Sequence, residues 1–193
     1  MKQLKTAIET ANRAGILMFC SASDQGANSN GHCYPGAWNQ CIRIGGATFT
    51  GEKLTWVDDD IDFSLPGRNV PFPSKDGKSI VYESGSSVAT AAASGLAGVS
   101  IYSARLLNAN NPEYKANIFE DRIKMTTAFR NMAAKGADRK FPQTDRILNK
   151  TFKKNIMNVI KKSRTIDIET LSWSKGDREF KALEDLLNQL QVV

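Results

Sequence analysis

The stretch YESGSSVATA, from Tyr82 to Ala91, decides the fold class of this chain. A glycine and two hydroxyl residues open a run of small side chains that continues to Gly98. We expect Ser87 to lie in the first turn of a buried helix, where small side chains let neighbouring elements pack closely. This position suits a nucleophile, because the N–H groups and the dipole of a helix N-terminus favour negative charge. The alternative is an ordinary N-cap serine, since serine is a preferred N-cap residue.

The segments upstream predict an α/β fold. A continuous apolar run over residues 16–20 is typical of a buried parallel strand. Parallel strands are predicted near 16–21 and 41–46, and shorter strands near 53–57, 61–64 and 79–83. A helix over 2–14 precedes the first strand, and a long helix over 86–107 follows the last.

Five short motifs then occur in a characteristic order. They are the segment Ser21–Gly26, the pair Tyr34-Pro35, and the segments Cys41–Ala47, Asp62–Gly67 and Gly85–Ala89. This series resembles the C-terminal half of the subtilisin-like serine protease family, with its Asn-containing loop, Tyr-Pro pair, Val-Gly-Ala strand, Ala-Pro-Gly turn and nucleophile helix. The resemblance covers residues 1–107 and implies half of a doubly wound parallel sheet, followed by a helical extension. In finer detail the chain is similar to the subtilases of fungal intracellular proteins.

The resemblance implies roles for five residues. Ser87 matches the nucleophile, and Ser21, Ala22 and Ser23 match one wall of the pocket for the residue before the scissile bond. Asp24 stands where most of the family has the Asn of the oxyanion hole. An ionised carboxylate cannot donate a hydrogen bond, and losing one such donor costs about 3–4 kcal/mol of transition-state stabilisation. Some working members also have Asp there, so the change weakens activity without excluding it.

The other two members of the catalytic triad have no match. The family carries them as Asp-(Thr/Ser)-Gly and His-Gly-Thr, and neither motif occurs here. The single histidine, His32, lies in a polar loop and is better explained as solvent-exposed than as a catalytic base. We therefore expect a fragment that is inactive by itself and whose missing N-terminal half carries the base.

Cysteine content and hydropathy argue against a disulfide-rich, metal-binding or membrane-spanning protein. Cys20, Cys33 and Cys41 form no disulfide framework, although the last two could be bridged in an oxidising compartment. We predict no metal and no cofactor, and we interpret Asp58–Asp60 as a solvated turn rather than a calcium loop. No apolar run approaches the ~20 residues that span a bilayer, and the N-terminus has no signal-peptide core. An intracellular protein without a membrane partner is expected.

The C-terminal part differs in charge and pattern. Residues 115–193 contain 17 Lys and Arg against 10 Asp and Glu. We divide the chain into a partial protease domain, residues 1–110, and a basic helical extension, residues 111–193, with three helices. Leucines recur at helical spacing between 183 and 190. The lysines between 150 and 162 could attract phosphate, but no nucleic-acid-binding motif accompanies them, so a solvated basic helix is the better explanation.

Two functions remain from different classes. The first is a subtilisin-like serine endopeptidase that acts on a peptide or protein substrate through Ser87. The second is a non-catalytic module of the same fold that binds or scaffolds. A basic nucleic-acid binder carried by residues 115–193 is a third and weaker hypothesis.

Overall fold

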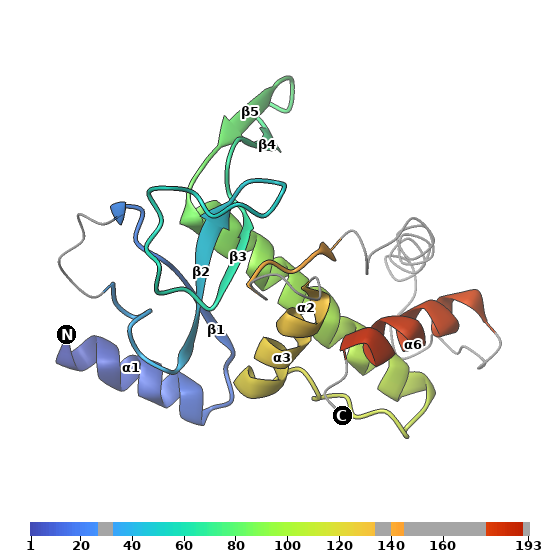
Figure 1. Cartoon of the computed structure of the whole chain (residues 1–193). Coiled ribbons are helices and arrows are strands. Elements are labelled where there is room, and N and C mark those ends of the chain that lie inside the picture. The colour runs from blue at the N-terminus through green and yellow to red at the C-terminus, as the bar shows by residue number, and fades with distance from the viewer. Residues whose placement is uncertain (27–32, 134–139, 145–176, 191–193) are drawn as a thin grey trace. The chain divides into compact units, whose positions relative to one another are not determined.

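The structure is a computed structural model that describes residues 1–26, 33–133, 140–144 and 177–190 (Figure 1). The chain forms two compact units. The first contains residues 1–96 and 138–142, and the second contains residues 97–137 and 143–193. Within the described part, no helix has the length and apolarity needed to cross a membrane.

A parallel three-stranded sheet organises the first unit. Its strands are β1 (Met18–Ser21), β2 (Cys41–Ala47) and β3 (Phe63–Pro66), in the order β1-β2-β3. Met18 is paired with Cys41, and Ile44 with Phe63. Every residue of the central strand β2 is buried, as expected when both faces of a parallel sheet are covered. The predicted α/β class with a parallel sheet is confirmed.

Helix α1 and a β-hairpin lie in the same unit as this sheet. Helix α1 (Lys2–Arg13) precedes β1, while β4 (Val70–Pro73) and β5 (Ile80–Glu83) pair antiparallel in a hairpin that projects beyond the sheet (Figure 1). The sequence did not predict β4, because Pro71 and Pro73 lack an N–H and demote a strand prediction. The predicted strand at 53–57 was wrong. Only an isolated bridge joins Lys53 to Ala47 there.

The long helix α2 (Ser86–Asn110) begins where the glycine-serine motif predicted a helix. Ala89, Ala93 and Ala97 are buried along one side. Gly95 and Gly98 are exposed, and a Cβ atom added to either would meet nothing within 4 Å. The expectation of a buried helix therefore holds for only part of its surface.

The described residues of the second unit include helices α3 and α6. Helix α3 (Arg122–Met132) is capped by Asp121, whose side chain accepts hydrogen bonds from the N–H groups of Ile123 and Lys124. Helix α6 (Arg178–Leu190) buries Phe180, Leu183, Leu186, Leu187 and Leu190 and contacts α3. The predicted leucine stripe thus packs inward. Residues 145–176, which include the lysines between 150 and 162, lie outside the described residues, so the prediction of three helices is not tested there.

Candidate active site

The candidate site lies at the carboxyl ends of the parallel strands, the edge where α/β sheets commonly bind ligands. Chain segments leave the sheet here after Ser21, Ala47 and Pro66, and α2 begins at Ser86. The sheet thus brings the loop after β1 to the first turn of α2, although 62 residues separate Asp24 from Ser86.

Three glycines let the backbone segments meet closely at this edge. A Cβ atom on Gly67 would lie 2.8 Å from the carbonyl oxygen of Gly85 and 2.9 Å from the Cα of Gly46. The N–H of Gly85 donates to the carbonyl of Gly67 at 2.8 Å. Gly85 itself has a φ of 142°, which disfavours other residues. These positions fix the turn that presents Ser86 and Ser87.

The carboxylate of Asp24 binds the start of α2. Its Oδ2 accepts the N–H of Ser86 at 2.9 Å, and its Oδ1 accepts the Ser86 hydroxyl at 2.6 Å. The Ser86 oxygen also accepts the N–H of Gly46 at 3.0 Å, and Ser86 is only 1% exposed. A negative charge at a helix N-terminus stabilises the helix by about 0.3–1 kcal/mol at exposed sites. Asp24 therefore caps α2 from a distant segment.

Ser87 follows Ser86 and faces solvent. The amides of Val88 and Ala89 donate to the carbonyl of Gly85. For the N–H and hydroxyl of Ser87, the described part of the chain offers no hydrogen-bond partner. Ser87 thus lies inside the first turn and combines an accessible hydroxyl with a backbone N–H that no described residue accepts. Its hydroxyl does not form the N-cap bond of the alternative interpretation.

The segment matched to the substrate pocket connects β1 to Asp24. Ala22 is 5% exposed and packs in a core cluster with Leu54, Val57 and Ile61. Its N–H donates to the carbonyl of Ile44 at 2.8 Å, and the carbonyl of Ser23 accepts the N–H of Asp58 at 3.1 Å. Ser21 and Ser23 are partly exposed. The side chain of Ala22 therefore belongs to the core, and its N–H is already bonded to the sheet.

The histidine and the cysteines form neither a metal site nor a second reactive site in the described part of the chain. His32 falls within 27–32, outside the described residues. No disulfide joins Cys20, Cys33 or Cys41 in the described part of the chain, and no described group of three His, Cys, Asp or Glu side chains could hold a metal ion. A hydrogen bond with Cys41 and burial raise the pKa of Cys20 far above its usual value. A thiol held protonated in this way is a poor nucleophile.

An ion-pair cluster beside the sheet was missed from the sequence. The Arg43 side chain, on the buried strand β2, is 5% exposed and donates to Asp58 at 2.9 Å and to Asp60. Asp58–Asp60 was interpreted as a solvated turn, yet two of its carboxylates bind this guanidinium. An arginine within an apolar strand was the available signal, because a buried charge requires a partner.

A family model and several solved structures match this chain. The family model "Peptidase S8, subtilase family" matches residues 1–151. The protease PagA of prenylagaramide maturation is 18% identical with a TM-score of 0.54, over 72% of this chain and 48% of that protein. The protease domain of PatA is 19% identical with a TM-score of 0.52, over 70% and 46%. The macrocyclase domain of PatG is 16% identical with a TM-score of 0.53, over 67% and 38%.

Fold and family define this chain as subtilisin-like. Because the family model matches well over half of the residues, the chain belongs to the subtilase family of serine proteases. It spans less than half the length of the solved structures named above. Comparison with curated protein sequences finds no match. The similarity to fungal intracellular subtilases is not tested by these matches and stays a prediction.

Proposed function

We propose that this chain is the nucleophile-bearing part of a serine endopeptidase. The observation that carries the proposal is the state of Ser87, an exposed hydroxyl in the first turn of α2 whose backbone N–H also has no acceptor among the described residues. The hydroxyl oxygen attacks the scissile carbonyl of a peptide and expels the amine. Water then hydrolyses the acyl-enzyme and releases the acid.

The backbone N–H of Ser87 is one donor for the oxyanion in this proposal. Asp24 stands at the position where most of the family has the oxyanion-hole Asn, and its carboxylate is already hydrogen-bonded to Ser86. A carboxylate offers no proton to the oxyanion when ionised and repels the developing charge. The loss of one donor corresponds to about 100- to 1,000-fold in rate. We therefore expect a slow enzyme.

The general base has to come from outside the described residues. A serine hydroxyl needs an adjacent base to become a useful nucleophile, and His-Gly-Thr and Asp-(Thr/Ser)-Gly do not occur in this sequence. In this proposal a further N-terminal half of the domain supplies both residues and completes the pocket around Ser21, Ala22 and Ser23. The chain alone is then inactive, and its substrate is a peptide or protein.

A fluorophosphonate probe tests the proposal. The probe phosphonylates an activated serine and releases fluoride, so mass mapping should find the adduct on Ser87 in protein that carries all three triad residues. Ser87→Ala should abolish the adduct. The matched control Ser94→Ala changes an exposed serine on the same helix and should leave the adduct unchanged. Failure of folded protein with a complete triad to react would reject the endopeptidase.

A non-catalytic binding or scaffold module is the second candidate. It is favoured by the hydrogen bonds that tie Asp24 to Ser86 and place a carboxylate where the family has an oxyanion donor. Such a module would bind peptides with the same affinity before and after Ser87→Ala, and its cellular role would survive the substitution. Loss of that role in the Ser87→Ala variant would count against it.

The division of the chain into residues 1–110 and 111–193 also remains a proposal. Expressing residues 1–110 alone tests it, since an independent domain should give a cooperative unfolding transition. The absence of such a transition, with cooperative unfolding of residues 1–193, would reject this boundary.

A further inference from the structure

A small pocket opens in the first unit, outside the residues proposed for catalysis. Its volume is about 210 Å³. Its walls come from the loop after β2, the turn before β3, β3 itself and residues 140–141. The lining residues are Gly51, Lys53, Asp59, Ile61, Ser64, Lys140 and Phe141.

The charged side chains of this pocket leave it positive. The Nζ of Lys53 donates to the carbonyl of Val57 at 2.9 Å and to the carboxylate of Asp59. Because an ammonium has three N–H donors, one donor of Lys53 remains. Lys140 has no ion-pair partner among the described residues. The pKa of Asp59 is held low mainly by the hydrogen bond and charge of Lys53, and to a lesser degree by the charge of Lys140. Two ammonium groups therefore face one carboxylate.

Ser64 brings an unused polar group to the same pocket. It lies on β3 and is 4% exposed. Its N–H donates to the carbonyl of Lys140 at 2.7 Å, but its hydroxyl has no hydrogen-bond partner within the described ranges. An unpaired hydroxyl in the wall of a positive pocket is a donor available to a ligand.

The pocket is closed on one side by Phe141 and matches a small ligand in size. A Cβ atom added to Gly51 would lie 2.9 Å from the Phe141 ring, so the ring rests directly on the glycine backbone. Pockets for drug-sized ligands measure about 300–1,000 Å³, whereas a water molecule occupies about 30 Å³. A volume near 210 Å³ accommodates an ion with a few water molecules.

We propose that this pocket binds a small oxyanion, either phosphate or a carboxylate, through Lys140, the remaining donor of Lys53 and the hydroxyl of Ser64. Hydrogen bonds between charged partners are stronger than neutral ones, and Lys140 supplies the charge that no described side chain neutralises. This proposal does not depend on whether Ser87 is catalytic.

Titration of the full chain with inorganic phosphate and with acetate, at constant ionic strength, tests the proposal. We expect saturable binding with a Kd in the millimolar range, measured through the shifts of the Ser64 and Lys140 amide resonances. Lys140→Gln should weaken binding by about tenfold or more, because it removes a charge-assisted hydrogen bond. Ser64→Ala should weaken it several-fold. Both substitutions leave the hydrogen bond between the Ser64 N–H and the residue 140 carbonyl in place.

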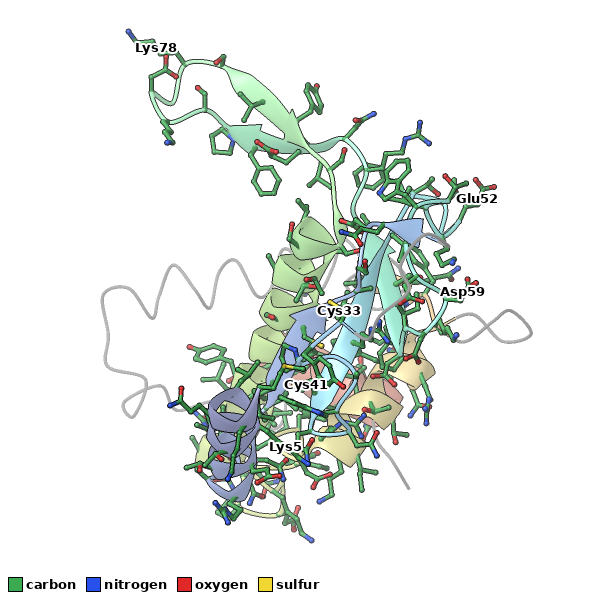
Figure 2. The ribbon with its side chains drawn as sticks, turned by 90° about the vertical axis from the view of Figure 1, so that its left-hand side faces the viewer. Lys5, Cys33, Cys41, Glu52, Asp59 and Lys78 are labelled. Atoms are coloured by element: carbon green, nitrogen blue, oxygen red, sulfur yellow. The ribbon has the colours of Figure 1, made fainter. Side chains whose placement is uncertain are left out.

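Lys5→Gln is the matched control, since it removes the same charge from α1, far from the turn of Asp59 (Figure 2). Saturable binding of phosphate but not acetate would assign the site to phosphate groups, and the reverse would assign it to carboxylates. Three results would overturn the proposal: no saturable binding of either anion, unchanged affinity in Lys140→Gln or Ser64→Ala, or equal weakening in Lys5→Gln.

Discussion

Asp24 and Ser86 are joined by two hydrogen bonds, one from the backbone N–H of Ser86 and one from its hydroxyl. This pair connects the loop after β1 to the start of α2 and so positions Ser87. The same carboxylate that holds the helix in place also puts negative charge beside the proposed nucleophile. Stability and catalysis therefore make opposite demands on Asp24.

Asp24→Asn separates these two demands. The amide can still accept the N–H of Ser86, but its NH₂ group faces a hydroxyl that already accepts from Gly46. We expect the free energy of unfolding to fall by about 1 kcal/mol, the net value of a typical hydrogen bond. In protein with a complete triad, fluorophosphonate labelling should become about 10- to 1,000-fold faster, because the amide can donate to an oxyanion. Urea denaturation and labelling kinetics measure the two effects, and slower labelling would show that Asp24 does not oppose catalysis.

Ser86→Ala and Ser87→Ala form a matched pair on adjacent residues. The first removes a buried hydroxyl that bonds both Gly46 and Asp24, leaving the Gly46 N–H without its acceptor. We expect a loss of about 1–3 kcal/mol in the free energy of unfolding. The second removes an exposed hydroxyl without a partner among the described residues and should change stability by less than about 0.5 kcal/mol. Equal losses in urea denaturation would contradict this arrangement.

Arg43→Met removes the buried guanidinium that binds Asp58 and Asp60. Breaking a buried pair costs about 3–5 kcal/mol, but the Asp60 side chain is 82% exposed and water can solvate it. We expect a loss of about 2 kcal/mol, with a smaller loss for Arg43→Lys, whose single ammonium cannot fork between two carboxylates. The control Arg105→Met breaks an exposed pair with Glu120 and should cost less than about 1 kcal/mol. A smaller loss of stability for Arg43→Met than for Arg105→Met would contradict a stabilising role of the buried Arg43 ion pairs.

Tyr114 gives the second unit a pH-dependent signature. Its hydroxyl donates to the carboxylate of Glu184, and this bond, followed by burial, raises the pKa of Tyr114 to about 12. The folded state therefore retains the phenol proton longer than the unfolded chain, whose tyrosine pKa is about 10. The stabilisation is complete below pH 10 and is lost as the pH rises through 12.

Glu184→Gln should move the pKa of Tyr114 back towards 10, because a neutral amide is a weaker acceptor for the phenol proton than a carboxylate and does not repel the phenolate. Ultraviolet absorbance follows phenolate formation directly. Asp185→Asn alters the next residue of α6, which is exposed, and should leave the Tyr114 titration in place. An unshifted titration in Glu184→Gln would mean that Glu184 is not the cause.

Much of this architecture is readable from local sequence pattern. The apolar runs predicted β1 and β2, the glycine-serine motif predicted the start of α2, and the leucine spacing predicted helix α6. Each prediction rests on residues close together in the chain, where periodicity or small side chains limit the backbone to few conformations. Local pattern failed at residues 53–57, where apolar Leu54 and Val57 fill the core from a turn rather than a strand.

The candidate site divides in the same way. The sequence determined by itself that Ser87 lies in the first turn of a helix that follows a glycine, since these features lie within a few residues. Only the tertiary structure decided three contacts. Asp24 caps that helix, Arg43 forms ion pairs with Asp58 and Asp60, and the N–H of Ser64 donates to the carbonyl of Lys140. Those contacts join residues between 15 and 76 positions apart, and their geometry follows from the order and register of the parallel strands. A local pattern cannot specify such a contact, because it depends on where the sheet brings distant segments together.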